Sequence, residues 1–270
     1  MPRKMTRQEL LEIIAQAAHD GREELDLSDR GITELAPEIG RLTNLKYLRL
    51  GNYSEPNKNQ LTKLPDEIGQ LANLQRLDVH NNRLAAIPES IGQLTNLRTL
   101  GLNHNQLTTL PESTGQLANL QSLYLHVNQL VTLPESIGQL VNLELLSLDH
   151  NQFVKVPEST GQLVNLITLG LSCNPIESLP EWIDQLSNLQ TLYLDEIQLT
   201  SLPDWIDQLT NLQTLYLENN QLATLPTSLA RLEKLEALHL DDNPLNLALQ
   251  SAYDAGLPAL FAYLRSLEDA

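Results

Sequence analysis

Leucine and other apolar residues recur along most of this chain with a period of 23 residues. Each copy reads approximately L-x-x-L-x-L-x-x-N-x-L and continues as x-x-L-P-x-x-I-G-x-L-x-N. A repeat of this length is one supersecondary unit, and it buries its apolar face only by stacking against the next copy. The pattern therefore predicts one elongated solenoid over residues 22–245 rather than two separate globular domains.

The central L-x-L of each repeat predicts a short strand. Successive side chains of a strand point to opposite faces, so both leucines face inward while the residues around them face outward. We expect ten parallel strands in one sheet, with an open concave face about 40 Å long. The ten L-x-L pairs begin at Leu25, Leu48, Leu77, Leu100, Leu123, Leu146, Leu169, Leu192, Leu215 and Leu238.

An asparagine follows nearly every predicted strand, and a Leu-Pro step follows the asparagine. The asparagine amide both donates and accepts, so we expect it to bond the backbone of its own turn and of the neighbouring turn. Arg30 and Ile197 replace it in the first and eighth repeats. Proline fixes φ and directs the chain to the convex side, where segments such as PESIGQL are long enough only for a turn of 3₁₀ or α-helix.

Both ends of the chain predict helical caps, at residues 1–21 and 246–270. Thr6 and Glu9 have the spacing of a capping box, and apolar residues then follow at helical spacing until Gly21. After Pro244 the period stops, and two short amphipathic helices are expected around Gly256. A helix at the end of a solenoid covers both the open core and the unpaired edge strand.

These motifs resemble the leucine-rich repeat family, over roughly residues 22–245. The 23-residue LPxxIGxLxxL form is similar to plant intracellular Ras-group proteins and to the repeat domain of bacterial Roco proteins. The resemblance implies an α/β solenoid, a horseshoe with ten parallel strands on the concave face and short helical turns on the convex face. It also implies a non-enzymatic scaffold that binds a protein or peptide on the concave face.

The carboxyl-terminal segment leaves a second interpretation open. GLPALFAYLRSL resembles the segment that joins the repeats of bacterial Roco proteins to their GTPase domain. The alternative function is therefore a regulatory repeat domain whose partner is a GTPase domain. No lysine of this chain follows a glycine, so the phosphate-loop motif is missing from it and GTP binding is not carried over.

Charge and cysteine content restrict the classes of partner and the compartment that we expect. The formal net charge is −17, and between Thr99 and Ala230 one basic residue, Lys155, stands against thirteen acids. Such a surface repels nucleic acid and anionic membranes and favours a basic partner, although the acids also serve to keep a long solenoid soluble. The single cysteine, Cys173, and the lack of a secretory signal or an apolar membrane run predict a cytoplasmic, monomeric protein.

The outward strand positions give the candidate binding residues. In the last three repeats Tyr193, Tyr216 and His239 fall in one column, beside an acidic column formed by Asp195, Glu218 and Asp241. Aromatic anchors flanked by acids suit a basic, partly apolar peptide or protein surface. The alternative is that tyrosine simply favours strands and acids favour exposed faces.

Histidines gather in the middle of the concave face. Tyr124 lies in the column of Tyr193, and His126 is predicted beside Asp149 on the adjacent strand, where the two could couple and titrate near neutral pH. Four histidines, His80, His104, His126 and His150, lie near one edge of the sheet. Their strand spacing is too wide for a shared zinc ion, so we expect polar surface and no metal or cofactor.

Two departures from the repeat are further candidates. An insertion after Gly51 carries Tyr53 beside the concave face, where it is either a binding loop or a neutral insertion. Trp182 and Trp205 replace the serine of P-E-S-I in consecutive repeats, and they predict either an exposed convex patch or partial burial under the adjacent turn. No set of nucleophile, base and orienting group recurs, so the sequence predicts no enzyme.

Overall fold

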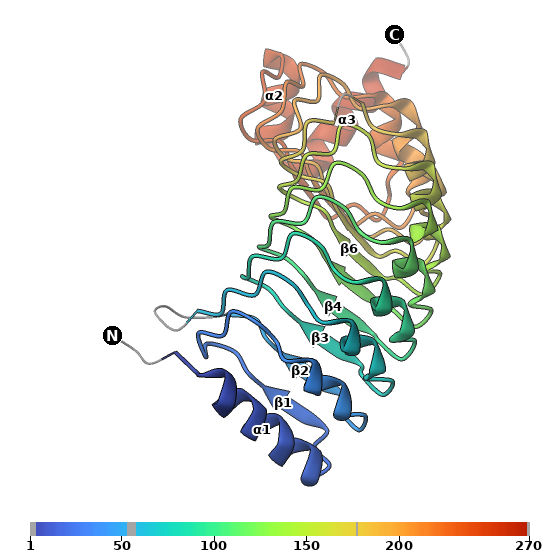
Figure 1. Ribbon diagram of the computed structural model, residues 1–270. Coiled ribbons are helices and arrows are strands. Elements are labelled where there is room, and N and C mark those ends of the chain that lie inside the picture. The colour runs from blue at the N-terminus through green and yellow to red at the C-terminus, as the bar shows by residue number, and fades with distance from the viewer. Residues whose placement is uncertain (1–3, 53–57, 177, 269–270) are drawn as a thin grey trace.

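The computed structural model describes residues 4–52, 58–176 and 178–268 of the chain, which stack into one curved solenoid (Figure 1). Its ten strands form a single parallel sheet in chain order, as predicted. Equivalent residues of successive repeats are in register, so Leu48 pairs with Leu77 and Leu77 with Leu100. The strands are β1 Glu24–Asp26, β2 Tyr47–Arg49, β3 Arg76–Asp78, β4 Thr99–Gly101, β5 Ser122–Tyr124, β6 Leu145–Ser147, β7 Thr168–Gly170, β8 Thr191–Tyr193, β9 Thr214–Tyr216 and β10 Ala237–His239.

The convex side consists of short 3₁₀ turns, one in each link between strands. A proline in extended conformation precedes all of them except the first, where Ala36 stands instead. The turns are η1 Pro37–Arg41, η2 Asp66–Gln70, η3 Glu89–Gln93, η4 Glu112–Gln116, η5 Glu135–Gln139, η6 Glu158–Gln162, η7 Glu181–Gln185, η8 Asp204–Gln208 and η9 Thr227–Arg231. The predicted fold class, a leucine-rich horseshoe with helical turns opposite the sheet, is confirmed.

Helices close both ends of the sheet (Figure 1). Helix α1, Arg7–His19, begins with the capping box of Thr6 and Glu9, and Leu10 and Ile14 are buried on its inner face. At the other end α2, Leu247–Asp254, and α3, Leu257–Glu268, pack on the last repeat through Leu249, Leu260 and other apolar residues. The core between these helices is a continuous stack of aliphatic side chains, with Phe153 as its largest fully buried member.

A ladder of buried asparagine amides joins consecutive repeats. The Nδ2 of Asn105 donates to the carbonyl of Leu102 in its own repeat (2.9 Å) and of Val79 in the preceding repeat (3.1 Å). Its Oδ1 accepts from the amide of Leu84 (3.0 Å). The expected double role of these side chains is therefore confirmed. The same bonds recur at Asn82, Asn128, Asn151, Asn174, Asn220 and Asn243.

The ladder has a gap where Ile197 replaces the asparagine. Ile197 is fully buried and offers no amide, and the residue that follows it, Gln198, adopts a positive φ of 61°. The next asparagine takes over part of the bonding, because the Oδ1 of Asn220 accepts from both Ile197 N (3.2 Å) and Leu199 N (2.9 Å). The seventh and eighth repeats therefore lack the buried ladder amide, although the exposed amide of Asn188 still donates to the carbonyl of Val164 (2.9 Å).

The residue before the asparagine position takes a left-handed backbone conformation in nearly every repeat. Its φ is 51° to 59° although none of these residues is glycine. Asparagine and aspartate accept such a conformation readily, whereas a β-branched residue does not. The residues are Asp29, Asn81, His104, Val127, His150, Cys173, Glu196, Asn219 and Asp242. Val127 is therefore a point of backbone strain.

Candidate protein-binding surface

Three aromatic rings form a continuous stack on the concave face of the last three strands. The rings of Tyr193 and Tyr216 lie 4.5 Å apart with an interplanar angle of 9°, and those of Tyr216 and His239 lie 4.4 Å apart at 4°. The parallel register places these residues directly opposite one another, at close to the usual strand spacing. The structure thus brings together the predicted column of Tyr193, Tyr216 and His239, which we call the aromatic stack.

The aromatic stack is half-buried, so its members are ordered yet still open to solvent. Burial raises the pKa of the Tyr193 hydroxyl, with further contributions from Tyr216 and Asp149, and this side chain stays neutral at physiological pH. Because neighbouring rings cover one another's faces, the stack presents ring edges, two phenol groups and the outer face of Tyr193, which lies next to Gly170. Such a surface suits aliphatic or aromatic side chains and the faces of guanidinium groups.

The acids beside the stack differ in their hydrogen-bond and ion-pair partners. Asp195 stabilises the carboxyl edge of the sheet, because its Oδ1 accepts a hydrogen bond from the amide of Glu218 (2.8 Å) and its Oδ2 accepts one from the hydroxyl of Ser172 (3.1 Å). Glu218 lies 3.7 Å from the Nδ1 of His239, and Asp241 is exposed at the end of the sheet near the hydroxyl of Tyr253. Glu218 and Asp241 are therefore the acids that a basic ligand on the stack would meet.

His126 and Asp149 are joined through Ser147 rather than directly. The hydroxyl of Ser147 donates to Asp149 (2.8 Å) and lies 3.0 Å from the Nδ1 of His126. Burial lowers the pKa of His126, and the neighbouring His104 lowers it further, so the ring is neutral near pH 7. The expected coupling of His126 to Asp149 therefore runs through Ser147, and burial outweighs Asp149 in setting the direction of the His126 pKa.

The remaining polar groups of the central concave face do not gather into a metal or redox site. Among the described residues no group of three or more histidine, cysteine, aspartate or glutamate side chains could hold a metal ion. Tyr124 and His104 each meet His126 edge-to-face, at 6.4 Å and 5.5 Å between ring centres. Burial and the nearby Glu196 raise the pKa of the Cys173 thiol to about 11, which keeps it protonated and unreactive.

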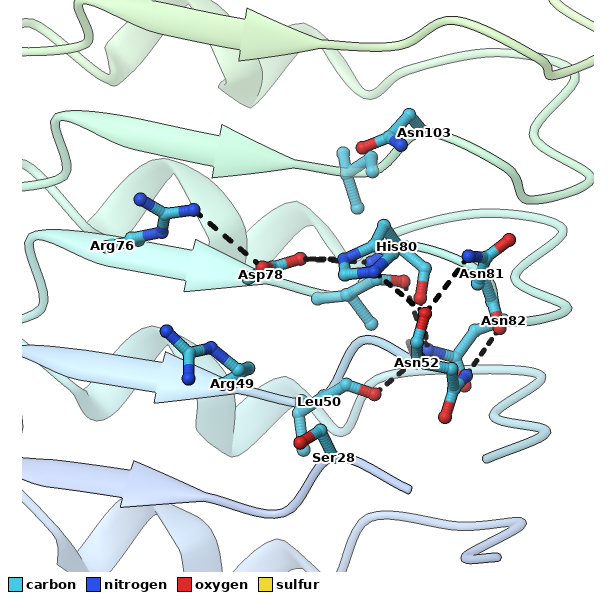
Figure 2. Close-up of polar contacts among 12 residues, drawn as sticks. Ser28, Arg49, Leu50, Asn52, Arg76, Asp78, His80, Asn81, Asn82 and Asn103 are labelled. Carbon is cyan, nitrogen blue, oxygen red and sulfur yellow. Dashed lines mark hydrogen bonds and ion pairs between the residues drawn. The ribbon is translucent and has the colours of Figure 1, made fainter. Parts of the chain in front are cut away.

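A buried polar cluster on β3 was not predicted from the sequence. Figure 2 shows the Asp78 carboxylate directed at the His80 ring, whose Nδ1 lies 2.5 Å from Asp78 Oδ1 and whose Nε2 lies 2.9 Å from the carbonyl of Asn52. The hydrogen bond to Asp78 raises the pKa of His80. Gly51 leaves room for the ring, because a Cβ at that position would overlap it. The signal in the sequence was this glycine, one strand away from His80.

The other two candidates give different outcomes. Tyr53 and residues 54–57 of the insertion lie outside the described residues. Trp182 is buried, with 5% of its surface exposed, and Trp205 is half-buried and packs against the core. The exposed convex tryptophan patch is therefore wrong. Gly161 explains the burial of Trp182, since the indole-bearing Cβ of Trp182 would lie only 2.8 Å from a Cβ at position 161.

A family model described as leucine-rich repeat region matches residues 25–127, 91–166 and 157–251. No curated protein matches the chain. Within the described part of the chain, no helix has the length and apolar character required to cross a bilayer.

Several solved structures share the fold. A plant peptide hormone receptor, RGFR1 in complex with RGF2, has a TM-score of 0.66 and 29% identity over 84% of this chain and 38% of the receptor. The GASSHO1/SCHENGEN3 ectodomain of Arabidopsis thaliana, in complex with CASPARIAN STRIP INTEGRITY FACTOR 2, has a TM-score of 0.56 and 27% identity over 90% and 34%. Toll of Drosophila, in its complex with Spatzle, has a TM-score of 0.73 and 25% identity over 91% and 32%. The chain thus spans about a third of the length of these three proteins.

Proposed function

The chain belongs to the leucine-rich repeat family, and from that premise we propose that it is a non-enzymatic scaffold that binds a protein or peptide on its concave face. The aromatic stack of Tyr193, Tyr216 and His239 is the observation that carries the proposal. Two of the similar receptors are described in complexes with RGF2 and with CASPARIAN STRIP INTEGRITY FACTOR 2, which supports a polypeptide ligand.

The chemistry of the stack selects a basic and partly apolar segment. Tyrosine contributes large contact areas at low entropic cost, and interface energy concentrates in such anchors. A guanidinium or ammonium group over the outer face of Tyr193, next to Gly170, gains a cation–π contact. Glu218 and Asp241 provide opposite charge along the rest of the stack. The excess of acids in the whole chain speeds the encounter with such a partner.

The test is selection of ligands from a random peptide library displayed on phage, with the intact chain as bait. Enriched peptides are expected to combine arginine or lysine with an apolar or aromatic residue. The double variant Tyr193→Ala/Tyr216→Ala should weaken binding of these peptides at least tenfold, because it removes the stacked surface while both leucine-bearing strands keep their core contacts.

Tyr47→Ala provides the matched control. Tyr47 is an exposed tyrosine on the same face at the far end of the sheet, on β2, and its removal should leave the affinity for the selected peptides unchanged. Circular dichroism and thermal unfolding of both variants check that the solenoid persists. Enriched peptides that bind the double variant as tightly as the parent chain would overturn the proposal.

A further inference from the structure

A second feature of the concave face is a hollow of about 290 Å³ at Gly101. Gly101 on β4 stands in register between Asp78 on β3 and Tyr124 on β5, and it has no side chain to fill the space between them. His126 and Arg76 complete the walls. The backbone of Gly101 does not require glycine, since its φ is not positive, so the missing side chain is what opens the hollow.

The hollow differs from the aromatic stack in having a guanidinium group, that of Arg76, which lies beside the carboxylate of Asp78. Of the outward strand positions from β1 to β10, only Arg49 and Arg76 carry lysine or arginine, and Arg49 already forms a 3.0 Å ion pair with Asp26. Acids stand instead at Asp195, Glu218 and Asp241, beside the stack. The concave face therefore has an exposed guanidinium beside a buried carboxylate at β3, and an acidic region at β8–β10.

Arg76 is well placed to take an anion. Its side chain is 50% exposed, and its ion pair in the described chain is a 3.9 Å contact with Asp78, longer than a hydrogen bond. Asp78 is compensated mainly by His80, which faces it from the same strand end (Figure 2). The planar guanidinium thus retains donors that match the two oxygens of a carboxylate.

We propose that the hollow at Gly101 receives a carboxylate of the same peptide whose basic residues lie on the aromatic stack. This proposal rests on the proposed function. The hollow is centred on β4 and the stack on β9, five strand spacings or about 24 Å apart. An extended peptide rises about 3.4 Å per residue, so its acidic and basic groups are about seven residues apart. The ligand is a dipolar segment whose acidic group lies over β4 and whose basic groups lie over the aromatic stack.

The experiment uses synthetic peptides with blocked termini and the intact chain. The reference peptide carries one glutamate and an Arg-Arg pair separated by about seven residues. Its companions replace glutamate with glutamine or halve the spacing. Isothermal titration calorimetry should show a loss of about tenfold in affinity for the glutamine and short-spaced peptides, because one charge-assisted contact is lost.

Two variants of the chain place the effect in the hollow. Arg76→Gln should remove the preference for glutamate over glutamine, whereas Arg98→Gln, the same change of charge at an exposed residue outside the hollow, should preserve it. Gly101→Val fills the space with a residue that strands accept, although its Cβ would lie 3.3 Å from Asp78 Oδ1. A folded Gly101→Val should lose the preference for glutamate over glutamine. If Gly101→Val does not fold, the preference measured with Arg76→Gln still tests the carboxylate site.

The outcomes separate the two proposals. Peptides that need Tyr193 and Tyr216 but bind equally well with glutamate or glutamine would overturn the carboxylate site and leave the scaffold proposal intact. A glutamate preference that survives Arg76→Gln would do the same. Binding that is indifferent to the two tyrosines, or no binding by any peptide of the set, would overturn both.

Discussion

Replacing Thr160 with valine should stabilise the solenoid. Thr160 occupies the isoleucine position of the convex turn, is completely buried, and its hydroxyl has no hydrogen-bond partner among the described residues. Burying a hydroxyl without a partner costs about 1–3 kcal/mol, and valine has nearly the same shape with a methyl group in its place. We expect a gain of about 1–3 kcal/mol in the free energy of unfolding.

The neighbouring repeats show that the position accepts a larger side chain as well. Ile137 and Ile183 stand at the equivalent places one repeat before and one repeat after Thr160, and both are fully buried. Thr160→Ile should therefore stabilise at least as much as Thr160→Val. Thr114, the same departure in an earlier repeat with the same unpaired buried hydroxyl, provides an independent repetition of the experiment.

The assay is urea unfolding followed by circular dichroism, with thermal unfolding beside it. A gain of 1–3 kcal/mol should raise the midpoint temperature by roughly 2–4 °C per kcal/mol in a chain of this size. Thr132→Val is the control, because this exposed hydroxyl already donates to the carbonyl of Leu133 (3.2 Å) and its loss should change stability by less than about 0.5 kcal/mol. Equal or lower stability of Thr160→Val would refute the reasoning.

Two further predictions concern the strand ends. Val127→Asn should raise the free energy of unfolding, measured with urea, by about 1 kcal/mol, because asparagine accepts the left-handed φ of 55° that strains valine. An unchanged free energy of unfolding would contradict the assigned strain. His80 contributes stability below its unfolded pKa of about 6.5, and loses it as the pH rises through the raised folded value, because Asp78 favours the charged ring. His80→Gln should therefore lower the free energy of unfolding most at pH 6 and least at pH 9. A loss of the same size at every pH would contradict this linkage.

The fold could be predicted from the sequence because every repeat has the same apolar and asparagine positions, which must be satisfied by the neighbouring repeats. Leucines of the L-x-L type need a common core, and asparagines such as Asn105 need backbone partners in two repeats, so register follows from the pattern itself. That register was enough to place Tyr193, Tyr216 and His239 in one column, and only the stacking angles had to come from the structure.

Contacts that depend on individual rotamers and local spacing could not be predicted in this way. Ser147 stands between His126 and Asp149 because its short side chain reaches both, and alternation along a strand does not reveal such a bridge. The pairing of His80 with Asp78 requires the space left by Gly51. The burial of Trp182 depends on how closely two convex turns approach, which composition does not indicate.

The gap in the asparagine ladder at Ile197 has a mechanical consequence. A solenoid pulled along its axis carries tension through the links between adjacent repeats, and most links consist of strand hydrogen bonds together with side-chain amides that span the joint. The joint between the seventh and eighth repeats retains its strand bonds but has no spanning amide from position 197. This seam divides the molecule into two segments of seven and three repeats, and the aromatic stack lies wholly within the shorter one. A partner that pulls on the stack therefore transmits its force to the first seven repeats across this joint, where the side-chain bonds of Asn188 to Val164 and of Ser172 to Asp195 remain.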